Sequence, residues 1–272
     1  MLKTSDAIYR DRGQNPLNGK RHFHSGEFEM LHVLSGSGII TIKDKIYPIV
    51  PNTVYLVSGN DAHYSSPDVP KLYIRNKIVF SNAELLSAAE YFGCKNCILD
   101  LFENGGAAIK LSDECSKELD SLFFHLIESL KEDGDKACLR VFSNLLSILK
   151  TVLESEEVNI PCIKNKLSDI LAFINENISK HLTLDLIAKK TGISKYYLCH
   201  SFASQVGMTV FEYIRIARIS KAMKLLVQTA ESISEISLET GFESFAYFSK
   251  VFREHVGMTP SEYRTISKPQ KK

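Results

Sequence analysis

Three histidines and a glutamate near the N-terminus have the spacing of a ligand set. The stretch "RHFHSGEFEMLHVLSG" contains His22, His24, Glu29 and Gly36 as H-x-H-x4-E-x6-G, and "NTVYLVSGNDAH" ends in His63. Three imidazoles and a carboxylate that converge in one pocket are sufficient ligands for zinc, iron or manganese. Without a metal, the same groups can hydrogen-bond the hydroxyls of a small polar ligand or one another. The residues alone leave both kinds of site open.

A second candidate site comes from a phrase that occurs twice. "VGMTVFEY" at 206–213 returns as "VGMTPSEY" at 256–263, and the similarity continues upstream. In each copy a short helix is expected to stop at a glycine that can adopt a positive φ, and a serine then caps a second helix. Helix, glycine turn, helix is the helix-turn-helix pattern. We therefore expect helix-turn-helix units at 184–206 and 233–256.

The repeated phrase itself carries a helix start. Thr209 and Glu212, like Thr259 and Glu262, have the spacing of a capping box, and Pro260 stands where a first helical residue is expected. Each phrase should therefore end one helix and begin the next.

The second helix of each unit has an apolar face and an exposed face. Apolar residues four positions apart form the buried stripe in both copies: Leu198, Phe202 and Val206, then Phe248, Phe252 and Val256. The exposed face is left with Tyr196, Cys199, His200 and Ala203, then with Ala246, Ser249, Lys250 and Arg253. Short, polar and basic side chains on such a face suit insertion into a DNA major groove. The alternative is a helical repeat that serves as a protein-binding scaffold, although two copies are few for a solenoid.

Charge divides unequally along the chain. Residues 1–163 carry 17 lysines and arginines against 22 aspartates and glutamates, whereas 164–272 carry 16 against 10, a net charge of +6. An excess of positive charge in one half is typical of a module that binds a polyanion. A chance distribution of surface charge would give the same difference, so charge supports the DNA hypothesis without deciding it.

The predicted secondary structure that positions these residues changes along the chain from strands to helices. Short β-rich runs separated by turn residues fill about 20–80 and predict a small antiparallel barrel or sandwich. From 82 the apolar spacing becomes helical, with long helices expected at about 112–131 and 135–154. The polar stretch at 154–163 then predicts a linker. We expect an α+β multidomain protein with an all-α domain at 164–272.

Cysteine usage and hydropathy indicate the compartment. The six cysteines are scattered, and the lone C-x-x-C of Cys94 and Cys97 lacks the second pair that a structural zinc site needs. No signal peptide is visible, and no apolar run approaches the roughly 18 residues that a membrane span needs. We therefore expect reduced thiols, a cytoplasmic location and no membrane partner.

The C-terminal hundred residues resemble the DNA-binding domain of the AraC family of bacterial transcription regulators, most closely in "GFESFAYFSKVFREHVGMTPSEYR". The resemblance implies two helix-turn-helix units that a long helix at about 210–228 joins, so that their reading helices enter adjacent major grooves of promoter DNA. The DNA-binding positions that it implies are Ser194, Lys195, Tyr196, Cys199, His200, Ala203, Ser244, Phe245, Ala246, Ser249, Lys250 and Arg253. This chain has His200 and Ala203 where the family often has arginine and, three residues later, lysine.

The N-terminal motifs resemble the two cupin motifs of the arabinose-regulator type of sensor domain, although Asn52, Ser58 and Asn60 stand where Gly, Pro and Gly are usual. The resemblance implies a cupin-like β-barrel at 1–81 that binds an effector, carbohydrate by analogy, through His22, His24, Glu29 and His63, without a cofactor.

The same resemblance implies a homodimer through the helices of 82–153 and RNA polymerase as a partner, in a regulator that is no enzyme. The alternative is a metal-dependent cupin enzyme, an isomerase or dioxygenase. The same four residues of the N-terminal motifs would hold its metal, and the basic domain would localise the enzyme.

Overall fold

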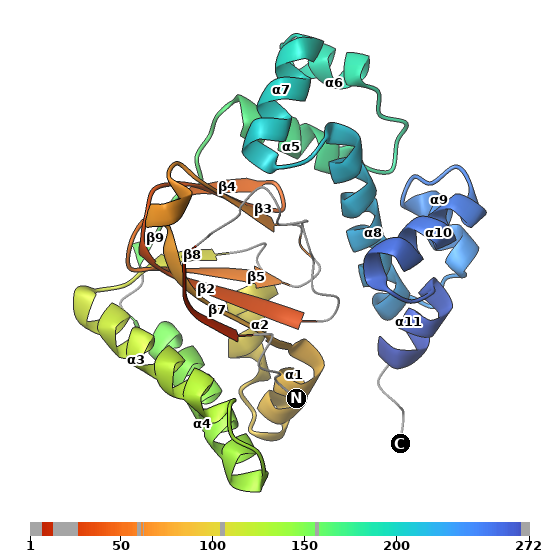
Figure 1. Cartoon of the computed structure of the whole chain (residues 1–272). Coiled ribbons are helices and arrows are strands. Elements are labelled where there is room, and N and C mark those ends of the chain that lie inside the picture. The colour runs from red at the N-terminus through yellow and green to blue at the C-terminus, as the bar shows by residue number, and fades with distance from the viewer. Residues whose placement is uncertain are drawn as a thin grey trace. The chain divides into compact units, whose positions relative to one another are not determined.

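The computed structural model describes residues 7–12, 27–58, 61, 63–103, 107–155 and 158–267. The chain divides into two compact units, and the second begins its continuous stretch at Lys164 (Figure 1). The first unit combines β-sheets with helices, whereas the elements described in the continuous stretch of the second unit, from Lys164, are all helices. The protein is thus a mixed α and β chain with two units.

Two antiparallel β-sheets form the first part of the first unit. Hydrogen bonds order the strands as β1-β7-β2-β5-β8-β9 in a six-stranded sheet and as β4-β3-β6 in a three-stranded sheet. The strands are β1 (Ala7–Arg12), β2 (Glu27–Ser35), β3 (Gly38–Ile42), β4 (Lys45–Pro48), β5 (Thr53–Ser58), β6 (His63–Pro67), β7 (Ile74–Ser81), β8 (Ala107–Lys110) and β9 (Val158–Asn159), with a 3-10 helix at Pro70–Leu72.

Alternation along β2 sends its side chains into two different cores. Phe28 and Met30 belong to the apolar core that the six-stranded sheet shares with the helices. Leu31 and Val33 point to the other face and pack with Ile40 and other apolar residues of the three-stranded sheet. Because successive side chains of a strand alternate between faces, a strand that is covered on both sides is apolar at almost every position.

The described strands form an open two-sheet sandwich and not the closed barrel that we expected. Strands β1 and β9 are the outer strands of the larger sheet, and in the part of the chain that the structure describes no ladder joins one sheet to the other. Apolar side chains pack between the sheets, and the Tyr55 hydroxyl of β5 donates a hydrogen bond to the Pro48 carbonyl of β4.

Residues 154–163, which we expected to be a linker, contain β9. This strand pairs with β8, and the Ile160 amide donates to the Ala108 carbonyl at 2.8 Å. The Ile163 amide donates to the Ile46 carbonyl at 2.6 Å. Backbone hydrogen bonds therefore attach this segment to the first unit as far as Ile163.

Helices α1 to α4 complete the described part of the first unit. Helices α3 and α4 pack against each other, and Gly134, with φ of 97°, immediately precedes α4. The apolar residues of α4 divide between two faces, since Leu145 and Leu149 are buried, whereas Leu139 and Leu146 are 69% and 41% exposed. The bounds are α1 (Asn82–Tyr91), α2 (Lys95–Glu103), α3 (Asp113–Ser129) and α4 (Asp135–Leu153).

The second unit consists of helices around one long central helix, α8. Phe202, Tyr213, Phe248 and Phe252 are fully buried in it. The bounds are α5 (Lys166–Glu176), α6 (Leu184–Thr191), α7 (Lys195–Val206), α8 (Val210–Gln228), α9 (Ile233–Glu239), α10 (Phe245–Val256) and α11 (Pro260–Ser267). In the described ranges, no helix combines the length and apolarity that crossing a bilayer would take.

Candidate functional site

The first helix-turn-helix unit is built from α6 and α7 (Figure 1). Helix α6 ends at Gly192, whose φ is 68° and whose amide donates to the Ala188 carbonyl. The Ser194 hydroxyl then accepts the Tyr197 amide at 3.1 Å and caps α7. The predicted glycine turn followed by a serine cap is confirmed in this copy.

The second helix-turn-helix unit, α9 and α10, has the same glycine turn and serine cap, but its turn is more tightly packed. Gly241 has φ of 89°, and a Cβ at this position would lie 2.8 Å from the Ile178 carbonyl oxygen. At Gly192 a Cβ would meet nothing within 4 Å. Ser244 caps α10 by accepting the Tyr247 amide at 3.4 Å. The prediction is confirmed here too, but only Gly241 is also required by close packing.

The repeated phrase joins helices in the predicted way. The Thr209 amide donates to the Glu212 carboxylate at 2.8 Å, and the Glu212 amide donates back to the Thr209 hydroxyl at 3.2 Å. Thr259 and Glu262 form the same two bonds at 2.7 and 3.3 Å. The amide of the threonine is the main reason that the pKa of each carboxyl lies below its usual range. These capping boxes start α8 and α11.

Helix α7 presents an aromatic and largely uncharged face. The rings of Tyr196 and His200 lie 4.5 Å apart, and both side chains are exposed. The Lys195 ammonium lies 2.6 Å from the Asp185 carboxylate. The sequence-predicted residues of this copy are all exposed: Ser194, Lys195, Tyr196, Cys199, His200 and Ala203. Leu198, Phe202 and Val206 are fully buried, as the apolar stripe predicts.

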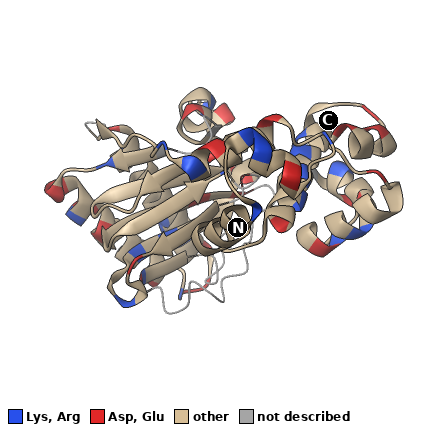
Figure 2. Ribbon diagram, turned by 90° about the horizontal axis from the view of Figure 1, so that it is seen from above, with Lys and Arg blue, Asp and Glu red and all other residues tan. Residues whose placement is uncertain are grey.

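Helix α10 presents a basic face at the equivalent positions. Lys250 and Arg253 are exposed, and the Lys250 ammonium lies 3.9 Å from Glu254. An exposed pair of this kind is weak, so Lys250 can exchange Glu254 for a phosphate or a base. The predicted residues Ser244, Phe245 and Ala246 are exposed too, and Ser249 is half-buried. Figure 2 shows that positions of both charge signs are interspersed along the helices of the second unit.

The structure places two of the four predicted effector residues. Glu29 is 2% exposed, and its carboxylate lies 3.4 Å from the Lys77 ammonium. His63 is half-buried, and its Nδ1 lies 3.2 Å from the Asp61 carbonyl. His22 and His24 lie outside the described residues. Among the residues that are described, no three His, Cys, Asp or Glu side chains come together as a metal site would require.

Two cations beside Glu29 were missed by sequence reasoning. Arg75 and Lys77 lie opposite Val33 and Leu31 in the ladder, and the Arg75 guanidinium lies 3.3 Å from Asp11 and 4.9 Å from the centre of the Tyr73 ring. The Arg75 Nε is buried and has no hydrogen-bond partner in the described part of the chain. A signal was present, because charges two residues apart in an apolar strand share one face. Paired charges and an unused donor can bind a polar or anionic molecule.

A second buried polar cluster lies on the helix side of the same sheet. His32 is fully buried, with its Nε2 2.9 Å from the Ser116 hydroxyl, and Asn76 donates to Asp120 at 2.9 Å. Burial lowers the pKa of His32 to about 4, an effect that nearby Asp120 opposes. The imidazole is therefore neutral at physiological pH and helps to tie α3 to the sheet.

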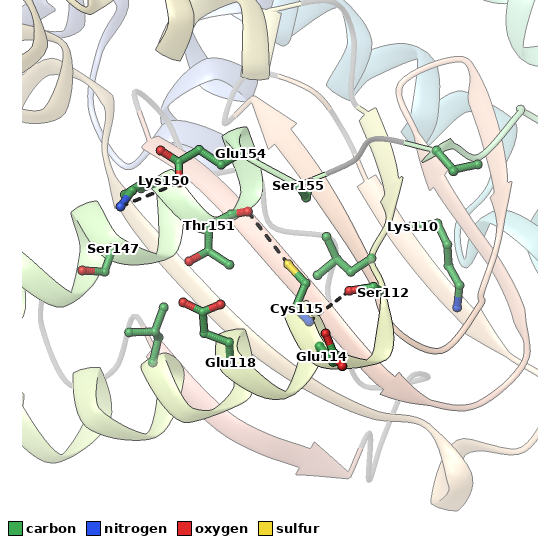
Figure 3. A pocket seen from close by; sticks show the side chains of 13 residues that line it. Lys110, Ser112, Glu114, Cys115, Glu118, Ser147, Lys150, Thr151, Glu154 and Ser155 are labelled. Carbon is green, nitrogen blue, oxygen red and sulfur yellow. Dashed lines mark hydrogen bonds and ion pairs between the residues drawn. The ribbon is translucent and has the colours of Figure 1, made fainter.

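A separate groove of about 840 Å³ lies between α3, α4 and the strands β8 and β9 (Figure 3). Glu118 points into it from α3, and α4 contributes Thr151 and the Lys150–Glu154 ion pair of 3.7 Å. The Cys115 thiol donates to the Thr151 carbonyl at 3.9 Å, and burial, with a contribution from Glu118, raises its pKa. Sequence reasoning did not mark this polar groove, because its residues come from segments that are far apart in the chain.

Comparison with known proteins gives three kinds of similarity. A family model described as a helix-turn-helix domain matches residues 187–266. The HTH-type transcriptional activator RhaR of Mannheimia succiniciproducens is 28% identical over 277 residues, which cover 97% of this chain and 97% of that protein. The regulatory protein SoxS of Escherichia coli is 39% identical over 98 residues, which cover 36% of this chain and 92% of SoxS. The solved transcriptional regulator of the AraC-type DNA-binding class from Chromobacterium violaceum is 33% identical over 39% of this chain and 95% of its own, with a TM-score of 0.37.

Proposed function

This chain belongs to the AraC family of transcription regulators, and we propose that a small polar effector bound in its first unit changes how its second unit binds promoter DNA. The observation that carries the proposal is the pair of helix-turn-helix units, each with an exposed polar face on the helix that follows a glycine turn. One chain with two reading helices would occupy two successive segments of major groove.

Twelve residues of the second unit would contact DNA. Serines at the helix starts and Lys195 would contact phosphates, whereas the middle of each reading helix would contact base edges. Exposure of nearly all of these side chains supports the assignment. The set is Ser194, Lys195, Tyr196, Cys199, His200, Ala203, Ser244, Phe245, Ala246, Ser249, Lys250 and Arg253.

The effector would bind in a cupin-like chamber beside Glu29. The half-buried Lys77 and Arg75 on the same face, and the unused Arg75 Nε, support a ligand rich in hydroxyl or carboxylate groups, such as a sugar or a related metabolite. His22, His24 and His63 would complete the site, as the resemblance of the N-terminal motifs implies.

A thermal-shift screen of sugars and sugar acids tests the effector proposal, because a ligand that binds only the native state raises the melting temperature. For the compound that raises it, His24→Ala and Arg75→Gln should abolish the shift. Glu118→Gln in the groove between α3 and α4 is the matched control and should retain it. A shift that the groove variant loses and the other two keep would move the effector site to the groove.

The metal-dependent enzyme alternative has its own test. Dialysis against zinc, iron(II) and manganese(II), followed by metal analysis, should leave less than one equivalent in the purified chain. Stoichiometric metal that His24→Ala removes, together with turnover of a sugar or sugar acid, would favour the cupin enzyme over an effector site.

A homodimer through the helices of 82–153 would place two DNA-binding units on paired sites. The exposed apolar face of α4 supports this partner, with Leu139, Phe142 and Leu146 at 69%, 38% and 41% exposure. Sedimentation of the full chain should give a dimer, and Leu139→Glu with Leu146→Glu should give a monomer. If the unmodified chain is a monomer at micromolar concentration, the homodimer proposal is wrong.

RNA polymerase would be the second macromolecular partner, in keeping with the activator name of the RhaR relative. Transcription in vitro from a bound promoter tests this partner. The expected result is a change in transcript yield that depends on both the chain and its DNA site.

A further inference from the structure

The C-x-x-C pair lies at the corner between α1 and α2. Gly93, with φ of 72°, ends the turn after α1, and the Cys94 amide donates back to the Ala89 carbonyl at 2.8 Å. Lys95, the next residue, is the first of α2. Cys94 is therefore fixed to the end of one helix and to the start of the next, and Cys97 lies in the first turn of α2.

The Cys97 side chain turns back toward Cys94. The Cys97 thiol donates to the Cys94 carbonyl at 2.8 Å, so its sulfur lies on the Cys94 side of the helix turn. The residue before a helix and the third residue within it are the two positions that a capping box joins, as Thr209 and Glu212 do in this chain. Shorter cysteine side chains at the same spacing form the disulfides of C-x-x-C proteins.

Both sulfurs are accessible to a reagent. Cys94 and Cys97 are exposed, whereas Cys115 and Cys138 are half-buried. The two other exposed cysteines, Cys162 and Cys199, have no second cysteine close in sequence. Only the C-x-x-C pair thus combines exposure with a neighbouring thiol fixed by local backbone geometry.

We propose that Cys94 and Cys97 are a redox modification site that forms a reversible intramolecular disulfide with low-molecular-weight disulfides such as glutathione disulfide. The thiolate of one cysteine attacks the glutathione disulfide, forms a mixed disulfide and releases one glutathione. The thiolate of the other attacks the protein sulfur of that mixed disulfide and expels the second glutathione. Two protein thiols are oxidised by two electrons, one glutathione disulfide is reduced to two thiols, and these take up the two protons.

The test equilibrates the reduced full-length chain in glutathione buffers of increasing oxidised fraction. Acid quenching, alkylation of the remaining thiols and peptide mass spectrometry then locate each modification. The unmodified chain should lose two hydrogens in the peptide that contains both cysteines. Cys94→Ser and Cys97→Ser should each prevent this loss, and the remaining thiol should carry at least about tenfold more glutathione than it does in the pair, because the neighbouring thiol no longer displaces it.

Cys199→Ser, which removes an exposed single cysteine, is the matched control and should leave the disulfide unchanged. Circular dichroism checks that the two single variants remain folded. The proposal fails if Cys94 and Cys97 acquire only separate glutathione adducts under conditions that modify Cys199. It fails equally if the pair retains zinc or copper(I) through dialysis and stays reduced, because the site would then be a metal site.

Discussion

The two reading helices share a scaffold and differ in the chemistry that they present. Each follows a glycine turn, begins at a serine cap and ends at a glycine of positive φ. The buried residues correspond, with Phe202 of α7 matching Phe252 of α10, but the exposed Tyr196 and His200 of α7 contrast with Lys250 and Arg253 of α10. Buried positions therefore define the unit, and exposed positions are free to differ between copies. We expect α10 to contribute more to DNA affinity than α7.

We expect the largest effect, a loss of folding stability, from substitutions at the two turn glycines, Gly192 and Gly241. Alanine at either turn glycine meets the left-handed penalty of roughly 1–2 kcal/mol, but Gly241→Ala also places a methyl group 2.8 Å from the Ile178 carbonyl. Gly241→Ala should therefore lower the free energy of unfolding by roughly 2–4 kcal/mol, against roughly 1–2 kcal/mol for Gly192→Ala. Urea unfolding followed by circular dichroism measures both variants. Equal losses would show that the two turns are packed alike.

The next effect concerns the charged side chains of α10. Lys250→Ala or Arg253→Ala should weaken promoter binding by roughly tenfold or more at about pH 7.5, because each direct base contact contributes about 1–3 kcal/mol. Lys117→Ala, the same loss of charge on an exposed position of α3, is the control and should bind normally. Fluorescence anisotropy with a labelled promoter fragment gives the affinities. A similar loss in the control would mean that net charge matters more than position.

Helix α7 should contribute less to promoter affinity than α10. It carries His200 and Ala203 at the positions equivalent to Lys250 and Arg253, so it has fewer cationic contacts to offer to phosphate or guanine. His200→Ala should therefore weaken binding less than Lys250→Ala near pH 7.5. The same anisotropy assay measures both variants. Equal losses would mean that the two helices contribute equally to the affinity.

The smallest expected effect is a gain in DNA affinity. Ala203→Lys gives α7 a charge at the position equivalent to Arg253, and should tighten binding a few-fold and steepen the salt dependence by about one unit of slope. Titrations at several salt concentrations give the slope. An unchanged slope would place residue 203 away from the phosphates.

The comparison also shows which features the sequence could predict. Gly192, Ser194 and the Thr209–Glu212 capping box follow rules that act within a few residues, so their structure was predictable. The two-residue strand β9 depends on β8, which lies about fifty residues earlier, and a short polar segment gives no local sign of such pairing.

In the first unit, the sequence indicated some of the important residues but not which residues they contact. Leu139 and Leu145 are both apolar residues of α4, yet only Leu145 is buried, because apolar spacing does not say which face of a helix is covered. Glu29 was singled out from its motif, whereas its partner Lys77, on another strand, was not. The burial on α4 and the Glu29–Lys77 pair both depend on contacts between residues that are far apart in the sequence, and a local sequence pattern does not contain that information.

The most direct test of the account is to locate which DNA segment each reading helix contacts. Fragments selected from random duplex DNA by the full chain are footprinted, and each protected segment is then substituted in turn. We expect two protected segments roughly 10 base pairs apart on one side of the duplex. Arg253→Ala should lose discrimination at one segment, Tyr196→Ala at the other, and the first loss should be larger. A single protected segment, or loss at the same segment in both variants, would contradict reading by two unequal helices of one chain.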